Sequence, residues 1–145
     1  MEPVVTKKGD WIDLYVPKYP EYDDDRKLLD LGIAIKLPPG YEAILAMRSS
    51  SYTRMGWMMG NGIGIIDNTY CGDQDVWKVS VHMTRSTDIN EKLLANARLV
   101  QFRIQLSQKA TFWQKLKWLF TSGVELKEVD HLSSTNRGGF GSTGR

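Results

Sequence analysis

The feature that most constrains the fold is the alternation of apolar and polar residues over short stretches of the chain. Residues 77–83 alternate in this way, and residues 98–106 do so through Val100, Phe102 and Ile104. Because successive side chains of a β-strand point to opposite faces, this period of two is typical of a strand with one buried face. Short strands with tight turns between them and few helical patterns predict an all-β sandwich, barrel or jelly roll.

Other segments fit the same class. Strands are predicted at residues 11–15, 32–37 and 41–47, with the turn residues Pro38, Pro39 and Gly40 between the last two.

A β-hairpin is predicted over residues 61–73. An apolar stretch leads to Asp67, and the turn formers Asn68 and Gly72 stand on either side of Tyr70. A rigid mount that carries an acid and an aromatic ring is a suitable place for chemistry. The alternative is structural, because an Asp-Asn pair is also ordinary turn chemistry.

Composition indicates one ordinary globular domain. The chain has 145 residues, of which 41% are hydrophobic and 25% charged. Its net charge of +2 is too small to argue for a nucleic-acid or membrane partner. Cys71 is the only cysteine, so neither an internal disulfide nor a Cys/His zinc cluster is expected. Neither a signal peptide nor a membrane span is evident in the sequence, and a cytoplasmic protein is expected.

Two segments have helical spacing, residues 88–97 and residues 111–120. The second combines Trp and Phe with lysines, a composition also found in helices that lie on membrane surfaces. Ten residues is short for that role, so packing against the domain or a partner subunit is the favoured interpretation.

Two further segments are predicted to be irregular. The acidic run at residues 21–25 is typical of a solvated loop, with a calcium or magnesium site as the less favoured alternative. The Ser-, Thr- and Gly-rich end of the chain, residues 133–145, is expected to be mobile until something orders it.

Two polar motifs are suited to phosphate. Arg48 with three serines behind it follows a predicted strand and offers guanidinium, hydroxyl and backbone donors. In residues 138–144 the glycines allow a close backbone approach, the hydroxyls suit phosphate, and Phe140 offers a ring for stacking. The alternatives for this second motif are an unstructured tail, or an RNA-binding tail of the Arg-Gly-Gly type, given Arg137.

In their order along the chain, these motifs resemble the five motifs of the homotrimeric dUTP diphosphatase family. The matching segments are Asp13 with its neighbours, residues 32–43 with 48–51, residues 65–73, residues 97–101 and residues 138–144. The resemblance implies a trimer of distorted jelly-roll subunits whose active sites are each built from three chains. It also implies a β domain at residues 1–132 and a flexible C-terminal arm at residues 133–145 that closes the site.

The resemblance implies a role for each matching residue. Asp67 would activate the attacking water, and Asp13 would hold a magnesium-bound water. Tyr70 would lie against the deoxyribose, Asn61 would pair with uracil, and Phe140 would stack on it. Phosphate contacts would come from Arg48, Ser49, Ser50, Arg98, Gln101, Arg137, Ser142 and Thr143.

The chemistry implied by the resemblance suits these residue types. Water would attack the α-phosphorus of dUTP, and Mg²⁺ with cationic side chains would neutralise the charge of the departing pyrophosphate. A carboxylate base contributes about 10²–10⁴-fold, so positioning and charge stabilisation must supply most of the acceleration.

This chain departs from the family pattern at three places. Met47 stands where a proline usually precedes the arginine of the second motif, and Cys71 stands where a basic residue is more common. Counted back from Phe140, the usual arginine of the arm falls on Thr135, so Arg137 would have to reach the same phosphate.

Two alternatives remain from the sequence. A dCTP deaminase-like enzyme shares the fold and an Arg-Ser-Ser motif, although it usually relies on a glutamate placed elsewhere. A protein-binding regulator switched by dUTP is the other, with the additional segments 21–27 and 111–120 as its means of contact. A nucleic-acid-binding protein ranks last, because it leaves residues 61–73 unexplained.

Overall fold

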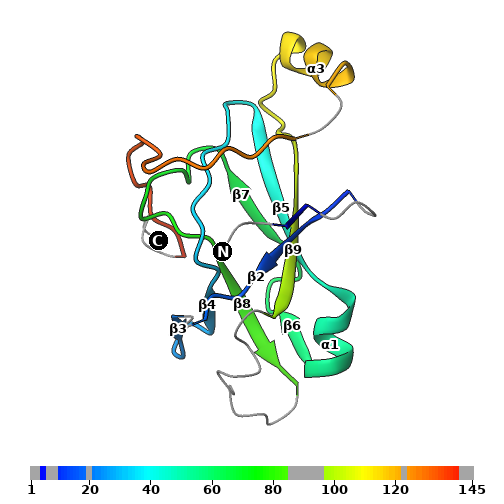
Figure 1. Ribbon diagram of the computed structural model, residues 1–145, viewed down its shortest axis with the longest axis vertical. Coiled ribbons are helices and arrows are strands. Elements are labelled where there is room, and N and C mark those ends of the chain that lie inside the picture. Colours follow the sequence, from blue (N-terminus) through cyan, green and yellow to red (C-terminus); the bar gives the residue numbers. More distant parts are fainter. Residues whose placement is uncertain (1–3, 6–9, 19–20, 85–96, 122–123, 141–145) are drawn as a thin grey trace. The chain divides into compact units, whose positions relative to one another are not determined.

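The computed structural model describes residues 4–5, 10–18, 21–84, 97–121 and 124–140 (Figure 1). Its strands and helices are β1 (Val4–Val5), β2 (Ile12–Tyr15), β3 (Tyr22–Asp23), β4 (Leu28–Asp30), β5 (Tyr41–Met47), α1 (Ser49–Met55), β6 (Trp57–Met59), β7 (Gly64–Asp67), β8 (Lys78–Met83), β9 (Arg98–Leu106) and α3 (Phe112–Leu119). The strands form a five-stranded sheet in the order β1-β2-β9-β5-β7 and a four-stranded sheet in the order β3-β4-β8-β6. The predicted all-β class is therefore confirmed.

The chain divides into two compact units, which are considered separately. The first comprises residues 1–33, 44–64 and 76–103, and the second comprises residues 34–43, 65–75 and 104–145.

The core of the first unit explains the alternation in the sequence. Val79 and Val81 of β8 are buried, whereas His82 on the other face is exposed. The rings of Trp77 and Phe102 are both fully buried and meet edge to face, with centroids 5.1 Å apart. Such contacts add to the free energy gained by removing two large rings from water.

In the second unit, one face of helix α3 contacts the segment that contains Pro39 and Tyr41. Thr111 and Gln114 form a capping box at the start of the helix. Gln114 Nε2 also donates to the Pro39 carbonyl oxygen at 2.6 Å, and the rings of Tyr41 and Trp118 lie 5.6 Å apart. Because Gln114 and Trp118 are four residues apart, the same face of the helix makes both contacts.

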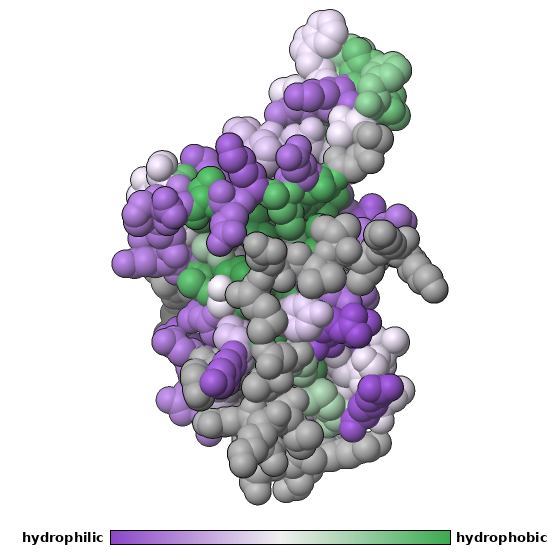
Figure 2. All heavy atoms as spheres, in the orientation of Figure 1, coloured by the Kyte–Doolittle hydropathy of each residue, from purple (hydrophilic) through white to green (hydrophobic). Residues whose placement is uncertain are grey.

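Another face of α3 is exposed and apolar. Its side chains, which are between 36% and 84% exposed, are Phe112, Trp113, Leu116, Leu119 and Phe120. Figure 2 shows hydrophobic residues gathered at the place where Figure 1 has α3. The helix predicted at residues 111–120 is confirmed, and most of its large apolar side chains face solvent in the single chain.

The prediction of a hairpin over residues 61–73 is wrong. Strand β7 lies beside β5 in the five-stranded sheet, whereas β8 lies between β4 and β6 in the other sheet. Residues 67–75 are therefore part of a connection between strands of different sheets, and we call them the Asp67 loop. Alternation along a strand shows which face is buried, but it does not show which strand will be its partner.

One other strand prediction differs from the structure, and one helix was not predicted. Residues 32–37 do not form a strand, although backbone hydrogen bonds of Leu31 and Ile33 with Trp77 hold the start of this segment. The polar residues 48–51 begin helix α1, with Arg48 as its N-cap, and Gly56 ends the helix with a φ of 70°.

Two more predicted strands agree with the structure, whereas the acidic run at residues 21–25, predicted to be a loop, includes strand β3. Strands are present within residues 11–15 and at residues 41–47. The acidic run leads into an exposed turn between β3 and β4, held by the pairs Asp23–Arg26 and Asp24–Lys27. The helix predicted at residues 88–97 lies outside the described residues except for Ala97. Among the helices described, none is both long and apolar enough to cross a membrane.

Phe102→Ala is expected to lower the free energy of unfolding by about 3–5 kcal/mol, because it removes a fully buried ring and leaves a cavity beside Trp77. The matched control Phe112→Ala removes the same atoms from an exposed position and is expected to change it by less than about 0.5 kcal/mol. Urea denaturation of both variants measures the difference. Equal effects would show that this assignment of the core is incorrect.

Candidate functional site

Asp13 is the buried centre of a charged group in the first unit. Strand β2 places it opposite Gln101 of β9, and its side chain is 5% exposed. Its Oδ1 lies 3.0 Å from Arg48 Nε in an ion pair, and its Oδ2 accepts from Arg98 Nη1 at 3.3 Å. A buried carboxylate needs such partners, because burying an unpaired charge is costly. The structure thus brings together Asp13, Arg48 and Arg98 from distant parts of the sequence.

The two arginines keep donors for a ligand. The side chains of Arg48 and Arg98 are 28% and 43% exposed, and each guanidinium has more N–H groups than one contact with Asp13 uses. Partly exposed guanidinium groups fixed by one carboxylate are suited to phosphate oxygens.

The three serines after Arg48 differ in their surroundings. Ser49 is exposed and Ser50 is half-buried at the start of α1. Ser51 is buried and donates through Oγ to the Leu99 carbonyl oxygen at 2.8 Å. Ser49 and Ser50 are therefore accessible to a ligand, whereas Ser51 holds the helix against β9.

The surroundings of Asp13 argue against direct ligation of a metal ion, whereas the role predicted for it is to hold a magnesium-bound water. Both of its oxygens are already paired with arginines, and two neighbouring positive charges disfavour a directly bound cation. Within the described residues, no group of three or more His, Cys, Asp or Glu side chains could hold a metal ion.

Asp67 is the centre of a second charged group, in the second unit. Its Oδ1 accepts from the Thr69 backbone N–H at 2.8 Å and from the Thr69 hydroxyl. Its Oδ2 accepts from Arg137 Nη1 at 2.6 Å. The contacts with Thr69, two residues further along, are those of an Asx turn, so the local chain fixes the direction of the carboxylate.

The charge state of Asp67 is set by these contacts. Partial burial raises the pKa of its carboxyl, but the hydrogen bonds from Thr69 and the Arg137 guanidinium lower it by more. The pKa of Asp67 therefore lies below its ordinary value, and the group is ionised at neutral pH.

Tyr70 lies beneath the C-terminal arm. Its side chain is 8% exposed, and a Cβ placed on Gly139 would lie only 3.2 Å from Tyr70 Cε2. Phe140 follows with 43% of its surface exposed and a φ of 53°. The structure thus brings Asp67, Tyr70 and Arg137 together and leaves the ring of Phe140 accessible.

The other predicted residues are less constrained by contacts. Asn61 is exposed in the turn between β6 and β7, and Gln101 is half-buried on β9. Ser142 and Thr143 lie outside the described residues.

Sequence reasoning missed two residues of the Asp67 loop. Thr69 could have been found, because a hydroxyl residue two positions after an aspartate often forms an Asx turn. Asp75 is 1% exposed and accepts backbone N–H groups from the arm. No sequence signal marked it, because aspartate is ordinarily an exposed residue.

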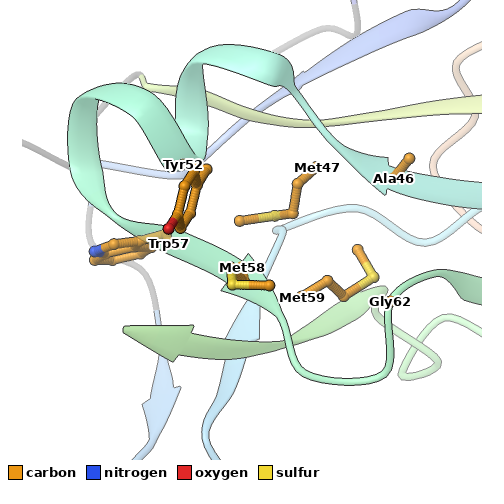
Figure 3. A pocket seen from close by; sticks show the side chains of 7 residues that line it. All are labelled: Ala46, Met47, Tyr52, Trp57, Met58, Met59 and Gly62. Carbon is orange, nitrogen blue, oxygen red and sulfur yellow. The ribbon is translucent and has the colours of Figure 1, made fainter. Parts of the chain in front are cut away.

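An apolar pocket lies in the first unit beside Asn61 and Arg48. It has a volume of about 380 Å³ and is lined by Ala46, Met47, Tyr52, Trp57, Met58, Met59 and Gly62. Figure 3 shows side chains from β5, α1 and β6 around it. Two of the lining residues are sequence neighbours of predicted substrate-binding residues. Met47 precedes Arg48, and Gly62 follows Asn61.

Sequence comparison finds similar proteins along almost the whole chain. The chain is 39% identical over 139 residues to the SPbeta prophage-derived deoxyuridine 5′-triphosphate nucleotidohydrolase of Bacillus subtilis (strain 168), covering 95% of this chain and 86% of that protein. It is 35% identical over 122 residues to the deoxyuridine 5′-triphosphate nucleotidohydrolase of a Hydrogenobaculum species, covering 83% and 72%. No family model matches the sequence.

Structural comparison supports the fold. The dUTPase of Staphylococcus bacteriophage 80alpha with dUPNHPP has a TM-score of 0.54 and 19% identity, covering all of this chain and 92% of that chain. With identity this low the likeness concerns the fold alone, and it confirms the predicted jelly-roll-like architecture.

Arg137→Met is expected to raise the pKa of the Asp67 carboxyl, because it removes a hydrogen bond and a positive charge that both favour the ionised form. Arg137→Lys, which keeps the charge, should raise it less. Titration of the Asp67 carboxyl carbon by NMR measures both. A pKa unchanged by Arg137→Met would show that the two side chains are not paired in solution.

Proposed function

Because the chain belongs to the deoxyuridine 5′-triphosphate nucleotidohydrolase family, we propose that it hydrolyses dUTP to dUMP and pyrophosphate, with Asp67 as the residue that activates water. The observation that supports this most directly is the Asp67 carboxylate, held ionised and oriented by Thr69. An ionised carboxylate can accept a proton from a water that attacks the α-phosphorus. Since the pKa of Asp67 is lowered, the group is a weak base, and charge stabilisation elsewhere must supply most of the acceleration.

The triphosphate binds to the charged group around Asp13. Asp13 holds Arg48 and Arg98 in place, and their remaining N–H groups face the phosphate oxygens. Ser49, Ser50 and Gln101 add donors around them, and Ser142 and Thr143 of the arm add hydroxyls. Arg137, which pairs with Asp67, reaches the phosphates when the substrate is bound.

The nucleoside is recognised by the turn before β7 and by the arm. Asn61 pairs with the uracil edge, and the apolar pocket beside Gly62 offers room next to that residue. Phe140 stacks on the base with its exposed ring. Tyr70 lies against the deoxyribose and leaves no room for a 2′-hydroxyl.

Magnesium enters with the substrate. Mg²⁺ is commonly held by substrate phosphates and waters with few protein ligands, and Asp13 would hold one of these waters. A structure of the dUTPase from phage phi11 of S. aureus is described as revealing the coordination of a structural Mg(II) ion. When bound, the ion supplies positive charge for the departing pyrophosphate.

The active protein is a cytoplasmic homotrimer with shared active sites, in which the Asp67 loop of one chain meets the arginines of another. Support comes from exposed apolar side chains near the predicted uracil site, because surfaces of this kind are covered in oligomers. They are Tyr52, Met58 and Ile63 of the first unit.

A protein partner at α3 is a second function on the same scaffold. Four large apolar side chains on this helix and Phe120 directly after it are exposed, and Lys115 and Lys117 lie between them in the sequence. Such a surface is suited to an apolar partner segment with carboxylates at its edge. A dCTP deaminase-like activity is the remaining alternative, and ammonia release from dCTP would decide for it.

Pyrophosphate release is expected from dUTP with Mg²⁺, and much less from dCTP, dTTP or UTP. Asp67→Asn keeps the shape of the side chain but removes the base, so kcat should fall by about 10²–10⁴-fold. The control Asp25→Asn makes the same change in an exposed turn and should leave kcat as it is. Turnover of dUTP by Asp67→Asn at the parent rate would exclude the proposed mechanism.

Shared sites are tested by combining two inactive chains. Chains with Asp67→Asn and chains with Arg48→Ala, carrying different affinity tags, are coexpressed and purified through both tags. Trimers that contain both chains are expected to regain dUTP turnover, because some sites then combine an intact Asp67 with an intact Arg48. Mixed trimers that stay as inactive as either parent would show that both residues act within one chain.

A further inference from the structure

Asp75 joins the Asp67 loop to the C-terminal arm through backbone hydrogen bonds. Its Oδ2 accepts from the Gly72 N–H at 2.9 Å and from the Arg137 N–H at 2.8 Å. Its Oδ1 accepts from the Gly138 N–H at 2.8 Å. The side chain is 1% exposed, so one buried carboxylate is shared between two segments more than 60 positions apart in the chain.

The backbone around Asp75 is shaped for this close approach. A Cβ placed on Gly72 would lie 2.6 Å from Asn136 Cα, a distance that excludes any side chain there. Gly138 has a φ of 72°, a conformation that other residues rarely adopt. The Gln74 N–H also donates to Asn136 Oδ1 at 2.9 Å. Loop and arm are thus fitted to each other over several residues.

The ionised Asp75 carboxylate depends on the arm for part of its hydrogen bonding. Burial raises the pKa of this carboxyl, and the N–H groups of Arg137, Gly72, Gly138 and Cys71 lower it below its ordinary value. Two of these four donors belong to the arm. Without the arm the carboxylate would lose half of them, and an ionised group with too few partners is costly to keep buried.

We propose that Asp75 is the positioning residue that anchors the C-terminal arm on the Asp67 loop. By holding the backbone of Arg137 and Gly138, it sets the Arg137 guanidinium against Asp67 and Gly139 against the ring of Tyr70. The catalytic consequence rests on the proposed function, whereas the anchoring itself does not.

Amide exchange in the full-length protein tests the anchor without any substrate. In Asp75→Asn, one oxygen that accepts hydrogen bonds from backbone N–H groups is replaced by an NH₂ group, which cannot accept them. Hydrogen exchange at the Arg137 and Gly138 amides should therefore accelerate about tenfold or more. The matched control Asp73→Asn changes an exposed acid of the same loop, which accepts from the Leu132 N–H. It should accelerate exchange at Leu132 and leave Arg137 and Gly138 unchanged.

A second variant tests the anchor independently, because Asp75→Asn could lose amide protection simply by unfolding. Gly139→Val adds bulk against Tyr70 without touching the buried carboxylate, so it should also release the Arg137 and Gly138 amides. In both variants the amide of Lys115, bonded to the Thr111 carbonyl oxygen within α3, serves as the internal reference and should keep its protection. Equal protection of Arg137 and Gly138 in the parent and in both variants would overturn the anchor.

Kinetics then separate anchoring from the proposed chemistry. Asp75→Asn should lower kcat/KM for dUTP by about tenfold or more, and adding it to Gly139→Val should cost little further, because the arm is already displaced. Full additivity of the two changes would contradict a shared role. If the parent turns over no dUTP while the amide results hold, the proposed function fails and the anchor stands.

Discussion

A buried carboxylate must find hydrogen-bond donors. This constraint shapes the charged group around Asp13 and the contact between the Asp67 loop and the C-terminal arm. Asp13 and Asp75 are the acids buried among the described residues. Asp13 is satisfied by the side chains of Arg48 and Arg98, and Asp75 largely by backbone N–H groups. In each case the need to pair one buried charge fixes segments that are distant in sequence. The geometry of the arginines and of the arm follows from these two acids.

In the proposed function, the two acids position other groups. Asp13 presents two guanidinium groups toward solvent, where they can meet phosphate. Asp75 holds the arm so that Arg137 meets Asp67, the proposed base. Pairing with Arg137 keeps Asp67 ionised but lowers its basicity, so much of the catalytic effect has to come from positive charge and orientation. The exposed helix α3 takes no part in either group and remains available to a partner.

The sequence predicted most of the strands, because alternation reports directly on burial. It also proposed Asp67, Tyr70, Arg48 and Arg137 as site residues through motifs whose order is characteristic, and the structure pairs Asp67 with Arg137 and Arg48 with Asp13. It did not reveal that β7 and β8 belong to different sheets, because strand pairing depends on contacts that no local pattern encodes. For the same reason Asp75 went unnoticed: its donors come from the arm, more than 60 positions away.

The central claim is that this chain directs water onto the α-phosphorus of dUTP, and isotope labelling tests it most directly. Hydrolysis is carried out in water enriched in oxygen-18, and both products are analysed by mass spectrometry. Attack at the α-phosphorus predicts that the heavy oxygen appears in dUMP and not in pyrophosphate. Label in pyrophosphate, or no conversion of dUTP at all, would contradict the account.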